Sequence, residues 1–201
     1  MTRIQTITVL TAALVTLLTL VPSARADTVV IRRPGDHPNY VLEAEPHLLL
    51  GFIDPPGPDV DDDFGFGPGF RGTLELVDNG FVPSINNSVG IGFGLDYLVY
   101  PGAARRCGPN PPGPGGGPCI EEDEDVSYVW IPVVMQWNFW LSRQWSVFGE
   151  PGVAFRIVSP GDDKFQPLVF FAGGRWHFSD SASLTMRLGY PAFSVGVSFL
   201  L

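Results

Sequence analysis

The residues whose types best suit catalysis are His177 and Ser179, which stand two positions apart near the C-terminal end of the 201-residue chain. A hydrolytic site needs a base beside the nucleophile and an acid that orients the base. The only acidic residue after Ser179 is Asp180, its direct neighbour in sequence. We therefore interpret 177–180 as a strand end followed by a turn. We predict that the protein is not an enzyme and uses no cofactor.

Two runs of acidic residues, 59–63 and 121–125, offer oxygen ligands of the kind that Ca²⁺ prefers. Neither run has the ligand spacing of an EF-hand loop. The glycine-rich stretch 65–69 lacks the Lys-Ser/Thr pair of a phosphate-binding loop. The sequence predicts solvated acidic loops and no metal site, and it leaves open whether these loops bind Ca²⁺.

A third set of reactive groups consists of carboxylates and arginines that share one side of several alternating segments. Arginine binds carboxylates with two parallel hydrogen bonds, and buried charges need such partners. On the inner face of a narrow barrel, these acids and arginines would neutralise one another. The predicted lumen ion-pair network comprises Glu43, Glu45, Arg71, Glu75, Asp96, Glu150, Arg156, Arg175 and Arg187.

The segments that carry these charges alternate between apolar and polar residues with the period of two that is typical of β-strands. From Val129 to Leu141 every odd position is apolar, whereas Gln136 and Asn138 occupy even positions. Eight segments show this pattern: 40–52, 65–76, 89–99, 128–141, 145–157, 168–178, 183–190 and 193–201.

The length of these segments favours a membrane protein, because about 9–11 tilted residues cross a bilayer while soluble strands average about 5–6. In a membrane barrel the apolar side faces outward and the interior is polar. We predict an all-β fold, an eight-stranded antiparallel up-and-down transmembrane β-barrel. The predicted lipid-facing residues are Val129, Ile131, Val133, Met135, Trp137, Phe139, Val153, Phe155, Phe170, Trp176 and Phe199.

Five prolines fall inside the predicted strands, although proline donates no hydrogen bond to a ladder and is normally confined to edges and bulges. A closed barrel has no edges. We therefore expect bulges or strand ends at several of these positions, which are Pro46, Pro68, Pro132, Pro151 and Pro167.

The N-terminus has the features of a secretory signal peptide: a positive charge at Arg3, a short apolar run, and a small-x-small site that ends at Ala26. We predict a signal peptide over 1–26 with cleavage after Ala26, a periplasmic segment over 27–39, and a barrel over 40–201 with a long outer loop at 101–125. Cleavage removes two arginines and no acid, which makes the chain more acidic than its net charge of −9. This acidity argues against a nucleic-acid partner.

Cys107 and Cys119 are the two cysteines of the chain, and they flank a stretch rich in glycine and proline. An even number of cysteines in an exported protein suggests a disulfide. We predict that Cys107 and Cys119 form a bond that closes the outer loop.

Over roughly residues 40–201 the chain resembles the small outer-membrane β-barrels of the OmpA, OmpX and opacity-protein type. The resemblance lies in the motif Gly173-Gly174-Arg175-Trp176-His177-Phe178-Ser179-Asp180, in 184–190 and in the alternating ending 193–201. This ending departs from the family pattern, because its aromatic residue is Phe199 and its last residue is Leu201. The resemblance implies the outer membrane of a Gram-negative bacterium, contact with outer-membrane lipid, and insertion by the barrel-assembly machinery.

The function that these patterns favour is a structural or surface-interaction role for an outer-membrane barrel with an ion-pair-plugged lumen, with an extracellular ligand left open. Two alternatives remain. One is a small-solute channel, and the other is a soluble secreted barrel that binds an apolar ligand inside.

Overall fold

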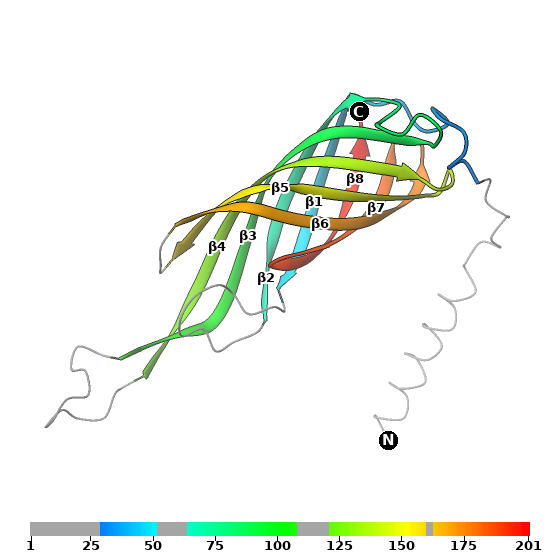
Figure 1. The fold of residues 1–201 in the computed structure, drawn as a ribbon. Coiled ribbons are helices and arrows are strands. Elements are labelled where there is room, and N and C mark those ends of the chain that lie inside the picture. Colours follow the sequence, from blue (N-terminus) through cyan, green and yellow to red (C-terminus); the bar gives the residue numbers. More distant parts are fainter. Residues whose placement is uncertain (1–28, 52–63, 108–120, 160–162) are drawn as a thin grey trace, which may run out of the picture.

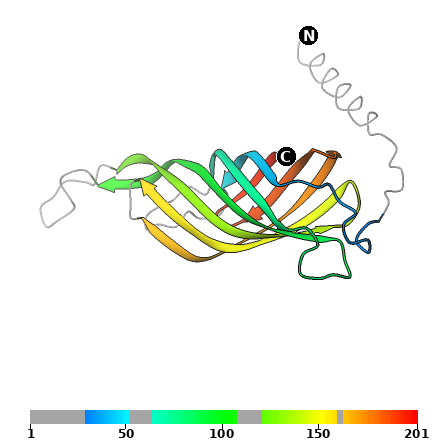
Figure 2. The same ribbon diagram turned by 90° about the horizontal axis from the view of Figure 1, so that it is seen from above.

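The protein is described by a computed structural model that covers residues 29–51, 64–107, 121–159 and 163–201, with only the main chain described for 102–107 and 121–124. Its eight strands form a closed barrel (Figures 1 and 2). They are β1 Leu42–Gly51, β2 Gly65–Val77, β3 Asn87–Cys107, β4 Glu121–Trp140, β5 Trp145–Ser159, β6 Lys164–Ser179, β7 Ala182–Gly189 and β8 Ala192–Leu200. Within the described ranges, no helix is long and apolar enough to cross a membrane.

Every strand pairs antiparallel with its neighbours in sequence, and β8 pairs with β1 to close the barrel. The predicted eight-stranded antiparallel up-and-down barrel is therefore confirmed. We call one end of the barrel the terminal end, because the strand β1 begins there and Leu201 lies there. The opposite end, from which the β3–β4 hairpin projects, is the hairpin end (Figure 1).

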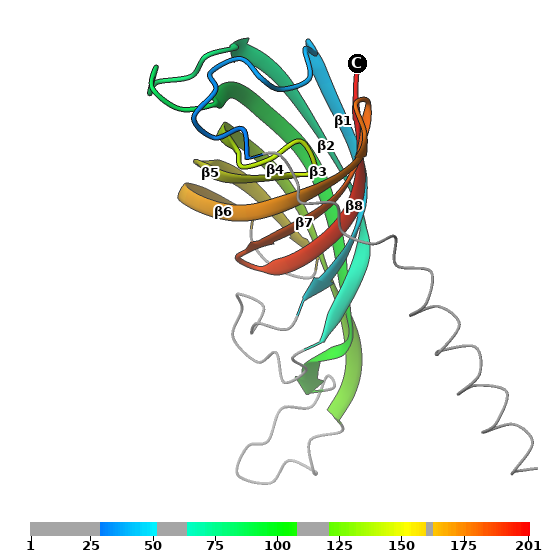
Figure 3. The same ribbon diagram turned by 90° about the vertical axis from the view of Figure 1, so that its right-hand side faces the viewer.

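The barrel wall is much taller on one side, because β3 and β4 contain 21 and 20 residues whereas β7 and β8 contain 8 and 9. Pairing of β3 with β2 stops at Val99, and pairing of β4 with β5 stops at Ser127. Beyond these residues β3 and β4 pair only with each other, and Figure 3 shows their hairpin running past the other strands.

The predicted loop 101–125 was too long, because β3 continues to Cys107 and β4 begins at Glu121. The register places Arg105 opposite Asp123 and Arg106 opposite Glu122. Alternation of apolar and polar residues is absent here because the hairpin extends beyond the barrel. Neither face of the hairpin therefore has to be apolar on the outside and polar on the inside.

The prolines fit the closed barrel by interrupting the ladder on one side only. Each of four prolines has a ladder partner in one neighbouring strand, while pairing with the other neighbour is interrupted there. Pro46 pairs with Phe70, Pro68 with Leu48, Pro132 with Ala154 and Pro151 with Phe170. Pro167 lies where the β5–β6 register shifts, so among these five prolines the expected bulge occurs only at Pro167.

Residues 29–41, which we call the N-terminal strap, pack against the terminal end of the barrel (Figure 1). Val30 is fully buried, and its N–H donates to the carbonyl of Leu141 at 3.0 Å. The N–H of Asn86 donates to the carbonyl of Ile31 at 2.7 Å. The described part of the predicted segment 27–39 thus packs on the end of the barrel, and its periplasmic location stays a prediction.

Candidate functional site

The barrel has an apolar outer wall and a charged interior, the reverse of a soluble protein. On β1 the side chains of Glu43, Glu45 and His47 are buried. The alternate residues Leu48 and Leu50 are 68% and 39% exposed. In a transmembrane barrel the outward face is apolar and the interior polar, so the polarity of this wall matches a hydrocarbon surrounding.

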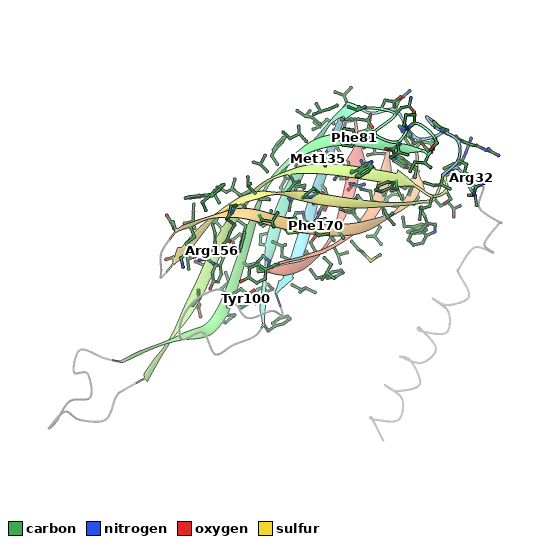
Figure 4. All side chains as sticks on the ribbon, viewed as in Figure 1. Arg32, Phe81, Tyr100, Met135, Arg156 and Phe170 are labelled. Carbon is green, nitrogen blue, oxygen red and sulfur yellow. The ribbon has the colours of Figure 1, made fainter. Side chains whose placement is uncertain are left out.

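None of the residues predicted to face lipid is buried. Figure 4 labels Met135 and Phe170, which lie on this outer surface, and Arg156, which lies inside. The exposed members are Ile131, Val133, Met135, Phe155, Phe170, Trp176 and Phe199, and the half-buried ones are Val129, Trp137, Phe139 and Val153. Their contact with lipid stays a prediction.

Arg187 of β7 lies at the centre of the interior and joins two carboxylates from opposite sides of the barrel. Its Nη1 and Nη2 donate to Glu45 of β1 at 2.6 and 3.0 Å. Its Nε and Nη2 donate to Glu150 of β5 at 2.9 and 3.2 Å. All three side chains are almost completely buried. The guanidinium therefore ties β1, β5 and β7 together across the lumen.

Arg175 of β6 makes a second bridge nearer the terminal end. Its Nε and Nη2 donate to Glu43 at 3.0 and 2.8 Å, and its Nη1 donates to the amide oxygen of Asn138 at 2.7 Å. The ring of Phe148 lies 4.2 Å from the guanidinium of Arg175 and 5.1 Å from that of Arg187. A side chain at Gly173 would overlap this ring. The phenylalanine and the glycine thus hold both cations in place.

Amide and hydroxyl groups complete this network toward the strap. Gln136 donates to Glu150 at 2.9 Å, and the Asn138 amide lies 3.2 Å from the Gln136 oxygen and 3.4 Å from the Tyr40 hydroxyl. Burial raises the pKa of the Tyr40 phenol, so this group stays neutral. The interior is therefore hydrogen-bonded continuously from Glu150 to the strap.

A third carboxylate site surrounds Asp96 of β3. His47 Nε2 lies 2.9 Å from Asp96 Oδ1, and Arg71 Nη2 donates to Asp96 Oδ2 at 3.1 Å. A side chain at Gly69 would overlap His47, so this glycine makes room for the pair. His47 was not among the predicted network residues, although it stands on the same side of its strand as Glu43 and Glu45.

Ion pairs join seven of the nine predicted network residues, and within the described part of the chain Glu75 and Arg156 lie outside these pairs. Glu75 is only half-buried and lies at the terminal end beside Asp78 and His37. Arg156 is buried in the hairpin half, where its Nε has no hydrogen-bond partner among the described residues.

The hairpin half of the interior is aromatic and aliphatic, which the sequence analysis did not predict. Tyr100 and Tyr128 pack edge to face with ring centres 5.6 Å apart, and Trp130 packs against Tyr190 at 6.0 Å. The cluster contains Leu49, Leu98, Tyr100, Val126, Tyr128, Trp130, Val134, Ala154, Val169, Phe171 and Ala192. A cavity of about 10 Å³, room for one water molecule, lies between this layer and the charged one.

The His177 and Ser179 pair does not form a hydrolytic site. His177 Nε2 lies 2.8 Å from the hydroxyl of Ser146, whereas Ser179 is at the exposed end of β6. His177 Nδ1 has no hydrogen-bond partner in the described part of the chain, so no acid orients the ring there. Ser146 is 0% exposed, which denies a substrate access to its hydroxyl.

Several predictions fall outside what the structure describes. The signal peptide 1–26 with its cleavage after Ala26, the acidic run 59–63, and Cys119 are not described. The side chains of Cys107 and of 121–124 are not described either. The disulfide and the question of Ca²⁺ binding therefore stay predictions.

The closed eight-stranded barrel, its apolar outer wall and its charged interior define a transmembrane β-barrel with the architecture of the small outer-membrane barrels. No protein-family model and no curated protein matches the chain.

Among solved structures, the Yersinia pestis outer membrane protein Ail in a phospholipid bilayer nanodisc aligns with 79% of this chain and 99% of its own, at 14% identity and a TM-score of 0.41. A crystal structure of Ail, the attachment invasion locus protein, aligns with 82% of this chain and 99% of its own, at 12% identity and 0.41. A de novo designed transmembrane β-barrel aligns with 85% of this chain and 99% of its own, at 10% identity and 0.43. The class assignment rests on the geometry of the barrel and not on these matches.

Proposed function

We propose that the protein is an outer-membrane barrel of a Gram-negative bacterium with a closed lumen and a structural or surface-interaction role. The observation that carries this proposal is the inversion of polarity, with Glu45, Glu150 and Arg187 paired inside and apolar side chains outside. A soluble barrel around an apolar ligand would have the opposite arrangement. The apolar side chains of the outer wall would then contact the lipid of the outer membrane.

The orientation that we propose places the hairpin end outside the cell and the terminal end in the periplasm. The turns β4–β5 and β6–β7 at the terminal end are short, as outer-membrane barrels have on the periplasmic side. Export through a signal peptide cleaved after Ala26 and insertion by the barrel-assembly machinery belong to the same proposal. The projecting β3–β4 hairpin would then present its surface to the medium.

The location can be tested by cell fractionation followed by electrophoresis of unheated envelope samples. We expect the protein in the outer-membrane fraction, where the folded barrel migrates differently from the boiled chain. Recovery from the culture fluid without detergent would favour the soluble barrel instead.

Conductance distinguishes a closed barrel from a small-solute channel. An eight-stranded barrel has an interior just wide enough for side chains to fill it, and here two layers of side chains occupy it. We expect no steady single-channel current when folded protein is inserted into planar lipid bilayers. A sustained current from protein with the folded electrophoretic mobility would contradict the closed lumen, and the boiled chain serves as the control for inserted but unfolded material.

We also propose that Cys107 and Cys119 form a disulfide at the tip of the hairpin. The β3–β4 ladder ends with Cys107 opposite Glu121, which brings the chain on both sides of the tip close together. We expect the oxidised protein to react with a thiol reagent only after reduction. Complete labelling of both cysteines without reduction would exclude the bond.

A further inference from the structure

A histidine and two carboxylates from three separate segments meet at the terminal end of the barrel. His37 comes from the strap, Glu75 from the end of β2, and Asp78 from the turn that follows β2. One potential ligand atom from each of them lies within 4.8 Å of the others, and His37 Nε2 is 3.6 Å from Asp78 Oδ1. The side chains are thus already gathered to a separation close to that of ligands around one cation.

The ring of His37 is fixed in an orientation that suits a ligand. Its side chain is buried and stacks on Trp140, with ring centres 5.1 Å apart and planes 9° apart. Its Nδ1 lies 3.2 Å from the carbonyl of Pro38, while its Nε2 faces the Asp78 carbonyl at 3.1 Å. Histidines that bind metals commonly donate their other ring N–H to a backbone carbonyl, as Nδ1 can do here to Pro38.

Both ring nitrogens of His37 face backbone carbonyl oxygens, Nδ1 that of Pro38 and Nε2 that of Asp78. With a cation held at Nε2, the Nδ1–H would donate to the Pro38 carbonyl, and the Asp78 carbonyl would lie beside the cation as a further oxygen.

Glu75 supplies an independent sign that a partner belongs there. Its Oε1 atom is buried and has no hydrogen-bond partner within the described residues. A buried acceptor without a partner is unfavourable, and more so when the group is charged. Asp78 is 53% exposed, so the cluster remains open to solvent on one side and an ion can reach it.

We propose that His37, Glu75 and Asp78 bind a divalent metal ion, with Zn²⁺ the best match. One imidazole and two carboxylates suit Zn²⁺, which takes nitrogen and oxygen ligands and leaves a fourth position for water. The ion would join the strap to β2 and to its turn. This inference goes beyond the proposed function and does not depend on the lumen or on the role of the hairpin.

The test is calorimetric titration of the untagged, folded protein with Zn²⁺ in detergent micelles. We expect one ion per chain in the wild type, and Glu75→Gln and Asp78→Asn should each weaken the affinity by about tenfold or more. Asp163→Asn is the matched control, because Asp163 is an exposed carboxylate just before β6, at the hairpin end and outside the cluster. The other two histidines, His47 and His177, are buried in the barrel and should not bind the added ion.

Circular dichroism and electrophoretic mobility will establish that each variant is folded. A second measurement replaces Zn²⁺ with Co²⁺, because bound Co²⁺ absorbs visible light. The visible spectrum of bound Co²⁺ should change in the variant His37→Phe, which removes the imidazole but keeps a ring against Trp140. The proposal is overturned if the wild type binds no Zn²⁺ at about 100 μM, a concentration well above typical affinities of structural sites. Equal binding by the wild type, Glu75→Gln and Asp78→Asn would also overturn it.

Discussion

Arg187→Met should lower the free energy of unfolding by about 3–5 kcal/mol, the usual effect of removing one partner from a buried ion pair. Arg187 makes four hydrogen bonds, two to Glu45 and two to Glu150. Without the guanidinium, both carboxylates stay in the closed interior with their main partner gone. Gln136 and Ser198 remain as uncharged donors, and His47 Nδ1 lies 3.5 Å from Glu45, so among the described residues no charged partner as close as the guanidinium replaces it.

The effect can be measured by urea unfolding of the barrel in detergent micelles, followed by tryptophan fluorescence. Arg143→Met is the matched control, because Arg143 is 71% exposed and pairs with Asp36 in solvent. Exposed pairs contribute about 0–1 kcal/mol. Adding Glu45→Gln and Glu150→Gln to Arg187→Met should restore part of the lost stability, since the uncompensated charges are then removed. A loss for Arg187→Met no larger than for Arg143→Met would mean that the network does not stabilise the barrel.

The fold was predictable from the sequence because a barrel in lipid enforces alternation at nearly every strand residue. A membrane makes the outer side apolar, so every odd position from Val129 to Leu141 is apolar, whereas the inward even positions include both polar and large apolar residues. The pattern fails at the β3–β4 hairpin, which stands clear of the barrel. It also says nothing about the strap, whose residues 29–41 form no strand and lie in place through scattered contacts to Leu141 and Asn86.

The interior network was predictable only in part. Whether a residue has an odd or even position in its strand tells which side of the wall it faces, but not its height along the barrel axis. Height follows from the stagger of the strands, which closure of the barrel sets. Arg187 and Glu150 fall at one level and meet. Glu75 stands on the inward side of its strand but lies nearer the terminal end, and Arg156 lies among aromatic residues at the hairpin end. The same limit hid the aromatic layer, since Tyr128 and Trp130 stand on the side assigned to polar groups.

Val133→Arg should destabilise the barrel in a lipid bilayer by about 2–4 kcal/mol, the cost of arginine on the lipid face near the midplane. Val133 is 44% exposed on the outer wall of β4, and it pairs with Phe93 and Val153 at mid-height of the barrel. Val133→Ile, which keeps the β-branched apolar surface, should leave the stability nearly unchanged.

Depth provides the sharper comparison, because the cost of arginine falls to about 0–1 kcal/mol near the membrane interface. Leu76 is also on the outer wall, at 65% exposure, but lies one residue from the end of β2. Unfolding free energies measured in lipid vesicles should therefore rank Val133→Arg well below Leu76→Arg. If the outer wall were surrounded by water, an arginine would be tolerated equally at either exposed position. Equal and small losses of unfolding free energy for both variants would therefore exclude a membrane barrel, on which the other proposals for the outer wall depend.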